Sequence, residues 1–171
     1  MPRSLPAYRL LAGLALALVC APAATAQLYA GLSGGYARVA DVPRYGVGVS
    51  FYIPAFDHAL DVVPSFDFYY RKWNARPTEV GTVWAANLDT RLNLPPVLRV
   101  VRPYAGVGLS LIGVDSPTRL GLNLTAGTFF RLFVRDVYPY AQVSYHVAEE
   151  FDAVNLLDTV FVQTGVRFAL F

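Results

Sequence analysis

The chain has 171 residues, with 14 Lys and Arg against 12 Asp and Glu, a single Cys and 55% hydrophobic residues. Such a small charge excess argues against a nucleic-acid-binding surface. One Cys excludes a disulfide within the chain and a metal site built from several Cys ligands.

The first residues have the pattern of a secretion signal. Arg3 and Arg9 precede an apolar segment at 10–19, and the A-x-A sequence at 24–26 is a cleavage site. We therefore predict a cleaved signal peptide at 1–26 and one mature domain at 27–171. The apolar segment is too short to cross a bilayer, which makes a membrane anchor the weaker alternative.

A lipoprotein signal at Cys20 is disfavoured, because the residue before it, Val19, is too large for that motif. Removal of the leader takes away Arg3, Arg9 and the only Cys, so the net charge falls from +2 to zero. No stretch of the predicted mature domain has the 18 continuous apolar residues of a membrane helix.

Apolar residues recur instead at every second position, which is the period of a strand. Turn-forming residues interrupt this pattern at 40–43, 54–58, 74–81, 95–99, 113–117, 133–136 and 149–157. Seven connections predict eight strands. The predicted apolar faces are, in chain order, Leu28, Ala30, Leu32 and Tyr36; Tyr45, Val47, Val49, Phe51 and Ile53; Leu60, Val62, Phe66, Phe68 and Tyr70; Trp84, Ala86, Leu88, Thr90, Leu92 and Leu94; Val101, Pro103, Ala105, Val107, Leu109 and Leu111; Leu120, Leu122, Leu124, Ala126, Phe130 and Leu132; and Val137, Ala141, Val143, Tyr145 and Val147.

The eighth predicted strand runs from Thr159 to an aromatic terminus, Phe171. Strands of roughly 10–13 residues with membrane-like hydrophobicity predict an all-β, eight-stranded antiparallel up-and-down transmembrane β-barrel. Its apolar faces are expected to point outward, whereas a soluble lipocalin-like barrel would turn them inward. Pro64 lies inside a strand and lacks a ladder donor, so we expect a bulge there.

An even number of strands places both termini on one side, which is the periplasm for this class of barrel. Outward aromatic residues are then expected in two rings at the membrane interfaces. The extracellular ring comprises Tyr36, Tyr45, Phe68, Tyr70, Trp84 and Tyr145, and the periplasmic ring comprises Phe51, Phe130 and Phe168.

Three segments resemble the small outer-membrane barrels of the OmpA/OmpX-like type. They are Tyr29-Ala30-Gly31-Leu32-Ser33-Gly34-Gly35-Tyr36, Arg102-Pro103-Tyr104-Ala105-Gly106-Val107-Gly108 and the terminal Phe171. The resemblance implies a monomer in the outer membrane of a diderm bacterium, in contact with lipid and lipopolysaccharide and inserted by the barrel-assembly machinery. It implies no cofactor. One departure is that Phe171 shares its parity with Ala169 and Arg167 rather than with the apolar residues of its strand.

Charged residues fall on the predicted inward faces. They are Asp61, Asp67, Arg71, Asp89, Arg91, Arg102, Arg131, His146 and Arg167. An eight-stranded barrel is narrow enough for side chains to fill it, and buried charges must be paired. We interpret the Asp and Arg residues as a structural network, with Arg71 near Asp89 and Asp67 near Arg91. A narrow polar path for a small solute or ion is the alternative.

Few residues indicate catalysis or metal binding. Ser144 and His146 share a face, but that face is predicted to point into the lumen, whereas a lipid-modifying barrel enzyme would need a lipid-facing pair. His58 is predicted at the opposite end from His146, which excludes a shared metal site. Glu149, Glu150, Asp152 and Asp158 make the last loop acidic; it could bind divalent cations, although a solvated loop is the simpler interpretation. The sequence thus favours a structural, non-enzymatic outer-membrane protein.

Overall fold

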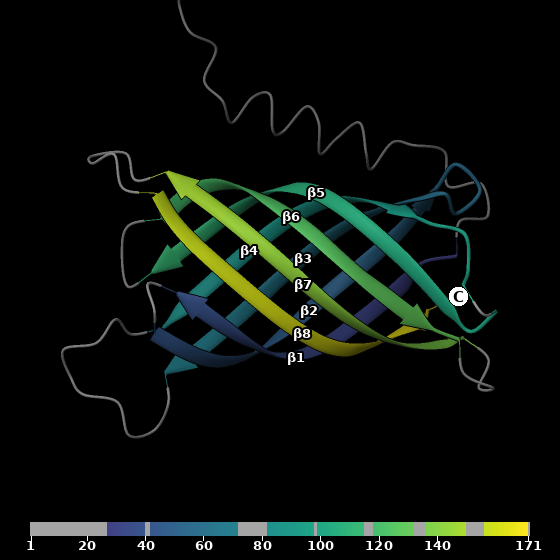
Figure 1. Ribbon diagram of the computed structural model, residues 1–171, viewed down its shortest axis with the longest axis horizontal. Coiled ribbons are helices and arrows are strands. Elements are labelled where there is room, and N and C mark those ends of the chain that lie inside the picture. Colours follow the sequence, from purple (N-terminus) through teal and green to yellow (C-terminus); the bar gives the residue numbers. More distant parts are fainter. Residues whose placement is uncertain are drawn as a thin grey trace, which may run out of the picture.

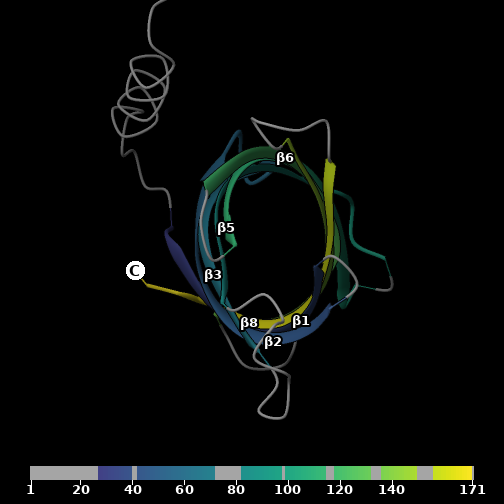
Figure 2. The same cartoon turned by 90° about the vertical axis from the view of Figure 1, so that its left-hand side faces the viewer.

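A computed structural model describes a closed barrel of eight antiparallel strands, which confirms the predicted fold class (Figures 1 and 2). The structure describes residues 27–39, 42–71, 82–97, 99–114, 118–131, 136–149 and 156–170. The strands are β1 (Tyr29–Val39), β2 (Val42–Ala55), β3 (Leu60–Arg71), β4 (Val83–Asn93), β5 (Val101–Val114), β6 (Thr118–Phe130), β7 (Val137–Glu149) and β8 (Leu156–Ala169). No helix in this described part is long and apolar enough to cross a membrane. The predicted leader at 1–26 and the terminal Phe171 lie outside it.

Pairing of the first strand with the last closes the barrel. Tyr29 of β1 lies opposite Ala169 of β8, and Val39 lies opposite Thr159. The start of β1 and the end of β8 therefore meet at one end of the barrel, on the right in Figure 1. We call this the termini end and the opposite one the loop end; Figure 2 looks into the barrel from the loop end.

The side chains alternate between an apolar exterior and a filled interior, as predicted. Val107 is 54% exposed and Leu122 is 59% exposed, whereas the neighbouring Ser110 and Asn123 are 1% exposed. An exterior made of exposed apolar side chains is the reverse of a soluble barrel, whose outer face would be polar. The lipocalin-like alternative is therefore wrong.

The prediction of a bulge at Pro64 is wrong. Ser65 pairs with Ser50 on one side of the proline and Val62 pairs with Ile53 on the other, without a change of register. On the β4 side, Pro64 lies directly opposite Leu88. β3 therefore accommodates the absent N–H of Pro64 without an extra residue, and every second residue continues to point inward along the whole strand.

Outward aromatic residues gather towards both ends. At the loop end the register pairs Tyr36 with Tyr45, whose ring centroids are 5.8 Å apart. Tyr45 in turn lies opposite Tyr70 on β3. At the termini end Phe51 and Phe168 lie on either side of Ala30.

Candidate functional site: the filled lumen

Buried side chains fill the lumen in three successive layers. The aromatic layer, nearest the termini end, comprises Tyr29, Tyr52, Val63, Tyr104, Phe129 and Tyr140. The central belt comprises Asp67, Asn87, Asp89, Arg91, Asn123, Gln142 and Gln163. The apolar layer, towards the loop end, comprises Ala37, Val39, Tyr69, Val83, Ala85, Ile112, Ala148 and Phe161.

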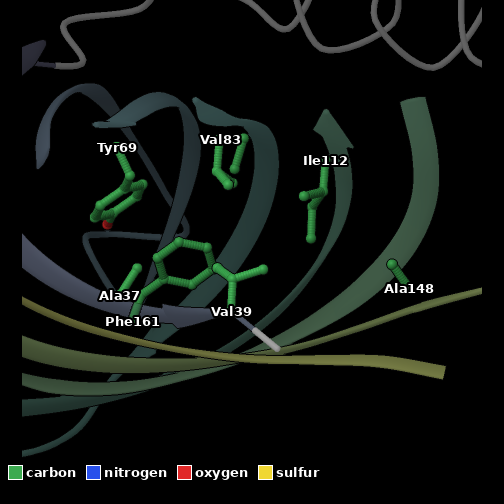
Figure 3. Packing of buried hydrophobic residues seen from close by; sticks show 8 residues of the cluster. Ala37, Val39, Tyr69, Val83, Ile112, Ala148 and Phe161 are labelled. Atoms are coloured by element: carbon green, nitrogen blue, oxygen red, sulfur yellow. The ribbon is translucent and has the colours of Figure 1, made fainter. Parts of the chain in front are cut away.

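The apolar layer lies on the loop side of the belt, and its side chains are drawn in Figure 3, where Tyr69, Phe161 and Val39 lie close together. The rings of Tyr69 and Phe161 lie 4.8 Å apart, from strands that are not neighbours in the sheet. His146 packs edge-on against Phe161 at 4.5 Å. Contacts between non-neighbouring strands require the two side chains to meet inside the lumen.

The aromatic layer fills the barrel on the other side of the belt. Phe129 lies at its centre, with its ring centroid 4.6 Å from that of Tyr104, 5.8 Å from Tyr52 and 6.0 Å from Tyr140. These separations are those of favourable aromatic pairs. Three neighbours from three different strands leave Phe129 5% exposed.

An ion pair between two residues of β4 lies in the central belt. Arg91 Nη2 donates to Asp89 Oδ2 at 3.0 Å, and both side chains are 3% exposed. Asp89 Oδ1 also accepts from Asn123 Nδ2 at 2.8 Å. The guanidinium carbon of Arg91 lies 5.5 Å from the ring centroid of Tyr52 and 5.3 Å from that of Tyr104. Each charge is thus buried with several partners, which is the condition under which burial is tolerated.

Amide side chains extend the belt across the lumen. Arg91 Nη1 donates to Gln142 Oε1 at 3.1 Å, and Gln142 Nε2 donates to Gln163 Oε1. Gln163 Nε2 donates to Asp67 Oδ1 at 2.6 Å, while Asn87 Nδ2 donates to Asp67 Oδ2 at 3.1 Å. The bonds connect β4 to β7 and β8 to β3, which are not adjacent in the sheet. A cavity of about 10 Å³ beside them has room for about one water molecule.

A second ion pair lies closer to the termini end. Arg167 Nη1 donates to Asp61 Oδ2 at 3.0 Å, and Asn93 Nδ2 donates to the same oxygen at 3.1 Å. The guanidinium carbon of Arg167 lies 3.9 Å from the ring centroid of Tyr29. This pair joins β8 to β3 and rests against the aromatic layer.

The predicted partners of Asp67 and Arg91 differ from those observed. Asp67 is bonded by Gln163 and Asn87, and Arg91 pairs with Asp89 of its own strand. The reason is the register, which places Asp67 opposite Ala85 and Arg91 opposite Asp61. The side chain of Arg71, which was predicted to lie near Asp89, is outside the described residues.

Two predicted members of the interior network lie outside it. Arg102 and Arg131 have inward parity, in phase with Tyr104 and Phe129 respectively, but both are exposed. Arg102 is the first inward residue of β5 and Arg131 directly follows the last residue of β6, so both line the mouth of the barrel at the termini end. The alternation of residues predicts which face of the strand a side chain is on, but it does not predict whether that side chain lies deep in the lumen or at the mouth.

Neutral residues make connections that the charge pattern did not reveal. Gln142 and Gln163 link the charged residues across the lumen, and Gln163 was not singled out in the sequence. Its parity with Arg167 on β8 is the signal that could have identified it. Arg44, buried at 0% exposure, was likewise missed, although it shares the inward parity of Gly46.

Comparisons with known proteins agree with this architecture. No protein-family model and no curated protein matches the chain. Solved structures do match it, among them Neisserial surface protein A, with a TM-score of 0.64 at 16% identity, covering 82% of this chain and 94% of that one. The fold is that of the small eight-stranded outer-membrane barrels.

Two further outer-membrane proteins share this fold. The N-terminal β-barrel domain of Pseudomonas aeruginosa OprF matches with a TM-score of 0.56 at 18% identity, over 85% of this chain and all of that one. Ail of Yersinia pestis, whose structure was solved with the heparin analogue sucrose octasulfate, matches with a TM-score of 0.51 at 12% identity, over 85% of this chain and 97% of that one. At these identities the likeness concerns the fold alone.

Glycines give the outer-membrane barrel fold the room for its large interior side chains. A Cβ on Gly127 would lie 2.5 Å from Tyr104 Oη, and a Cβ on Gly165 would lie 2.7 Å from Tyr140 Cζ. A Cβ on Gly106 would lie 2.9 Å from Arg91 Cγ. Inward glycines therefore do not widen a path here, because side chains from neighbouring strands occupy the space.

The residues considered for catalysis or metal binding are the Ser144–His146 pair, which lies inside the barrel, and the acidic side chains of the last loop. Ser144 Oγ lies 2.9 Å from Thr125 Oγ1, and His146 is 2% exposed against Phe161. Both face the lumen, as their parity predicted. In the described residues no group of three or more His, Cys, Asp or Glu side chains could hold a metal ion. The described residues do not include the acidic side chains of the last loop.

Proposed function

We propose that this chain is a non-conducting structural protein of the outer membrane of a diderm bacterium. The observation that carries the proposal is the combination of an apolar exterior with a lumen that is filled at three levels. An apolar exterior on a closed sheet suits lipid, because closure leaves no unpaired strand edge. A lumen filled by bonded side chains suits a rigid body rather than a pore.

The proposal includes a route to the membrane. Residues 1–26 act as a cleaved export signal, the barrel-assembly machinery inserts the barrel, and the termini end faces the periplasm. The exterior contacts lipid and lipopolysaccharide, and the protein acts as a monomer without a cofactor. The two groups of outward aromatics support this placement, since amphipathic rings favour membrane interfaces.

A narrow channel and a lipid-modifying enzyme fit the structure less well. A channel would have to pass the Asp89–Arg91 pair and the rings around Phe129, which are buried by contacts across the lumen. An enzyme acting on lipid would need a nucleophile and a base on the exterior, whereas Ser144 and His146 point inward.

Deletion and complementation test the structural role. Loss of the protein should raise the sensitivity of the envelope to detergents, and the parent sequence should restore resistance. Complementation by Ser144→Ala should be equal to that by the parent, with an unchanged lipid A mass spectrum. A deletion strain whose detergent resistance is unchanged, or a lipid A mass shift that Ser144→Ala abolishes, would overturn the proposal.

A further inference from the structure

The mouth of the barrel at the termini end contains a cavity of about 410 Å³. Its base includes Tyr29 and Phe129 of the aromatic layer, so it opens to solution on one side and ends against packed rings. A volume of this size is typical of a small-molecule site. The cavity is thus a blind pocket.

Four arginines from different parts of the chain line this pocket. Arg99 comes from the turn between β4 and β5, Arg102 from the start of β5, Arg131 from the end of β6 and Arg167 from β8. Arg167 is paired with Asp61. Within the described residues no carboxylate forms an ion pair with any of the other three. The pocket has one carboxylate in its own lining, Asp57, so positive charge is in excess.

Hydrogen bonds to backbone carbonyls of two turns hold the walls of the pocket together. The N–H of Arg131 donates to Val100 O at 2.7 Å, which ties the end of β6 to the β4–β5 turn. The side-chain amide of Asn93 donates to His58 O at 3.0 Å, which ties the β2–β3 turn to β4. Arg99, with φ of 61°, and His58, with φ of 64°, adopt left-handed backbone conformations in these turns, which are sparsely populated for residues other than glycine. The arginines therefore project from a connected scaffold.

We propose that this pocket binds a small phosphate-bearing anion with at least two negative charges. Guanidinium groups recognise phosphate through paired N–H donors, and three of the four form no ion pair with a carboxylate among the described residues. Convergence of like charges is unfavourable without a counter-ion, so a multivalent anion stabilises the arrangement. Arg102 and Arg131 have the parity of the inward-facing residues, so they line the mouth and not the lipid-facing exterior. The inference rests on the pocket geometry and does not require the proposed structural role.

Titration calorimetry with inorganic pyrophosphate tests the site on the folded barrel in zwitterionic detergent. The parent should bind one pyrophosphate, and the double variant Arg102→Gln, Arg131→Gln should bind about tenfold or more weakly. A control of equal charge change is Arg38→Gln with Arg119→Gln, since Arg38 lies at the end of β1 and Arg119 at the start of β6, both at the loop end; it should bind like the parent. Heat-modifiable gel migration verifies that each variant is folded. No binding by the folded parent, or equal weakening in both double variants, would overturn the proposal.

Nanodiscs distinguish the two sources of phosphate. If a lipid headgroup occupies the pocket, discs that contain cardiolipin, whose headgroup carries two phosphates, should weaken pyrophosphate binding relative to phosphatidylcholine discs in the parent. If the ligand is a soluble phosphate compound, the affinity should be the same in both discs at physiological salt. Either result supports a phosphate site, whereas binding that is independent of the mouth arginines in both discs contradicts it.

Discussion

Neutralising Asp89 is the sharpest perturbation of the central belt. Asp89→Asn keeps the shape of the side chain but leaves the Arg91 charge buried without its carboxylate, at 3% exposure. Removal of one partner of a buried ion pair costs about 3–5 kcal/mol. Arg91 retains its hydrogen bond to Gln142 and its contacts with two tyrosine rings, so we expect the lower limit, about 3 kcal/mol.

Reversible urea unfolding in lipid vesicles, followed by tryptophan fluorescence, measures this loss. Asp57→Asn is the matched control, because Asp57 is exposed in a turn whose left-handed backbone Asn tolerates. It should change the free energy of unfolding by no more than about 0.5 kcal/mol. Equal, small effects of the two substitutions would refute the argument that the belt is a packed network of buried charges.

A second substitution tests the coupling directly. Arg91→Met removes the charge that Asp89→Asn leaves unpaired, and Met is apolar and of comparable length. The double variant should therefore be more stable than Asp89→Asn alone, by about 1 kcal/mol or more, because residues within one network couple by about 0.5–3 kcal/mol. Additive costs would mean that the two side chains do not depend on each other.

Two matched pairs of substitutions test the two faces of the barrel, each by the same unfolding assay. Gly127→Ala should cost about 1–3 kcal/mol through overpacking, since the new methyl group would meet Tyr104 Oη and backbone, whereas Gly34→Ala, whose nearest atom is 3.9 Å away, should be nearly neutral; equal costs would contradict the tight interior packing. Leu122→Arg on the exterior should cost about 2–4 kcal/mol if it lies near the bilayer midplane, against about 0–1 kcal/mol for Leu94→Arg near the termini end. Equal costs for the two arginine variants would contradict the proposed membrane placement.

Strand faces could be read from the sequence because lipid and lumen impose opposite requirements on alternate residues. On β5 the apolar and polar positions alternate without interruption from Val101 to Leu111, and the burial pattern follows that order from Pro103 onward. The same rule placed Ser144 and His146 inside. Closure of β8 on β1 followed from the even number of strands and the need to leave no unpaired edge.

Side-chain partners could not be read in the same way, because they depend on register and depth. The connection between β3 and β4 is long enough to permit several registers, and the one observed places Asp67 opposite Ala85. Arg102 and Arg131 were assigned to the correct face but lie at the mouth. Neutral Gln163 gave no charge signal, although it links Asp67 to the rest of the belt.

Conductance in planar lipid bilayers tests the central claim most directly. The filled lumen predicts that folded parent protein, verified by heat-modifiable migration, produces no steady single-channel currents above those of the bare bilayer. Reproducible currents from the folded parent, with an ion selectivity that changes in Asp89→Asn, would contradict the account and establish a channel through the central belt.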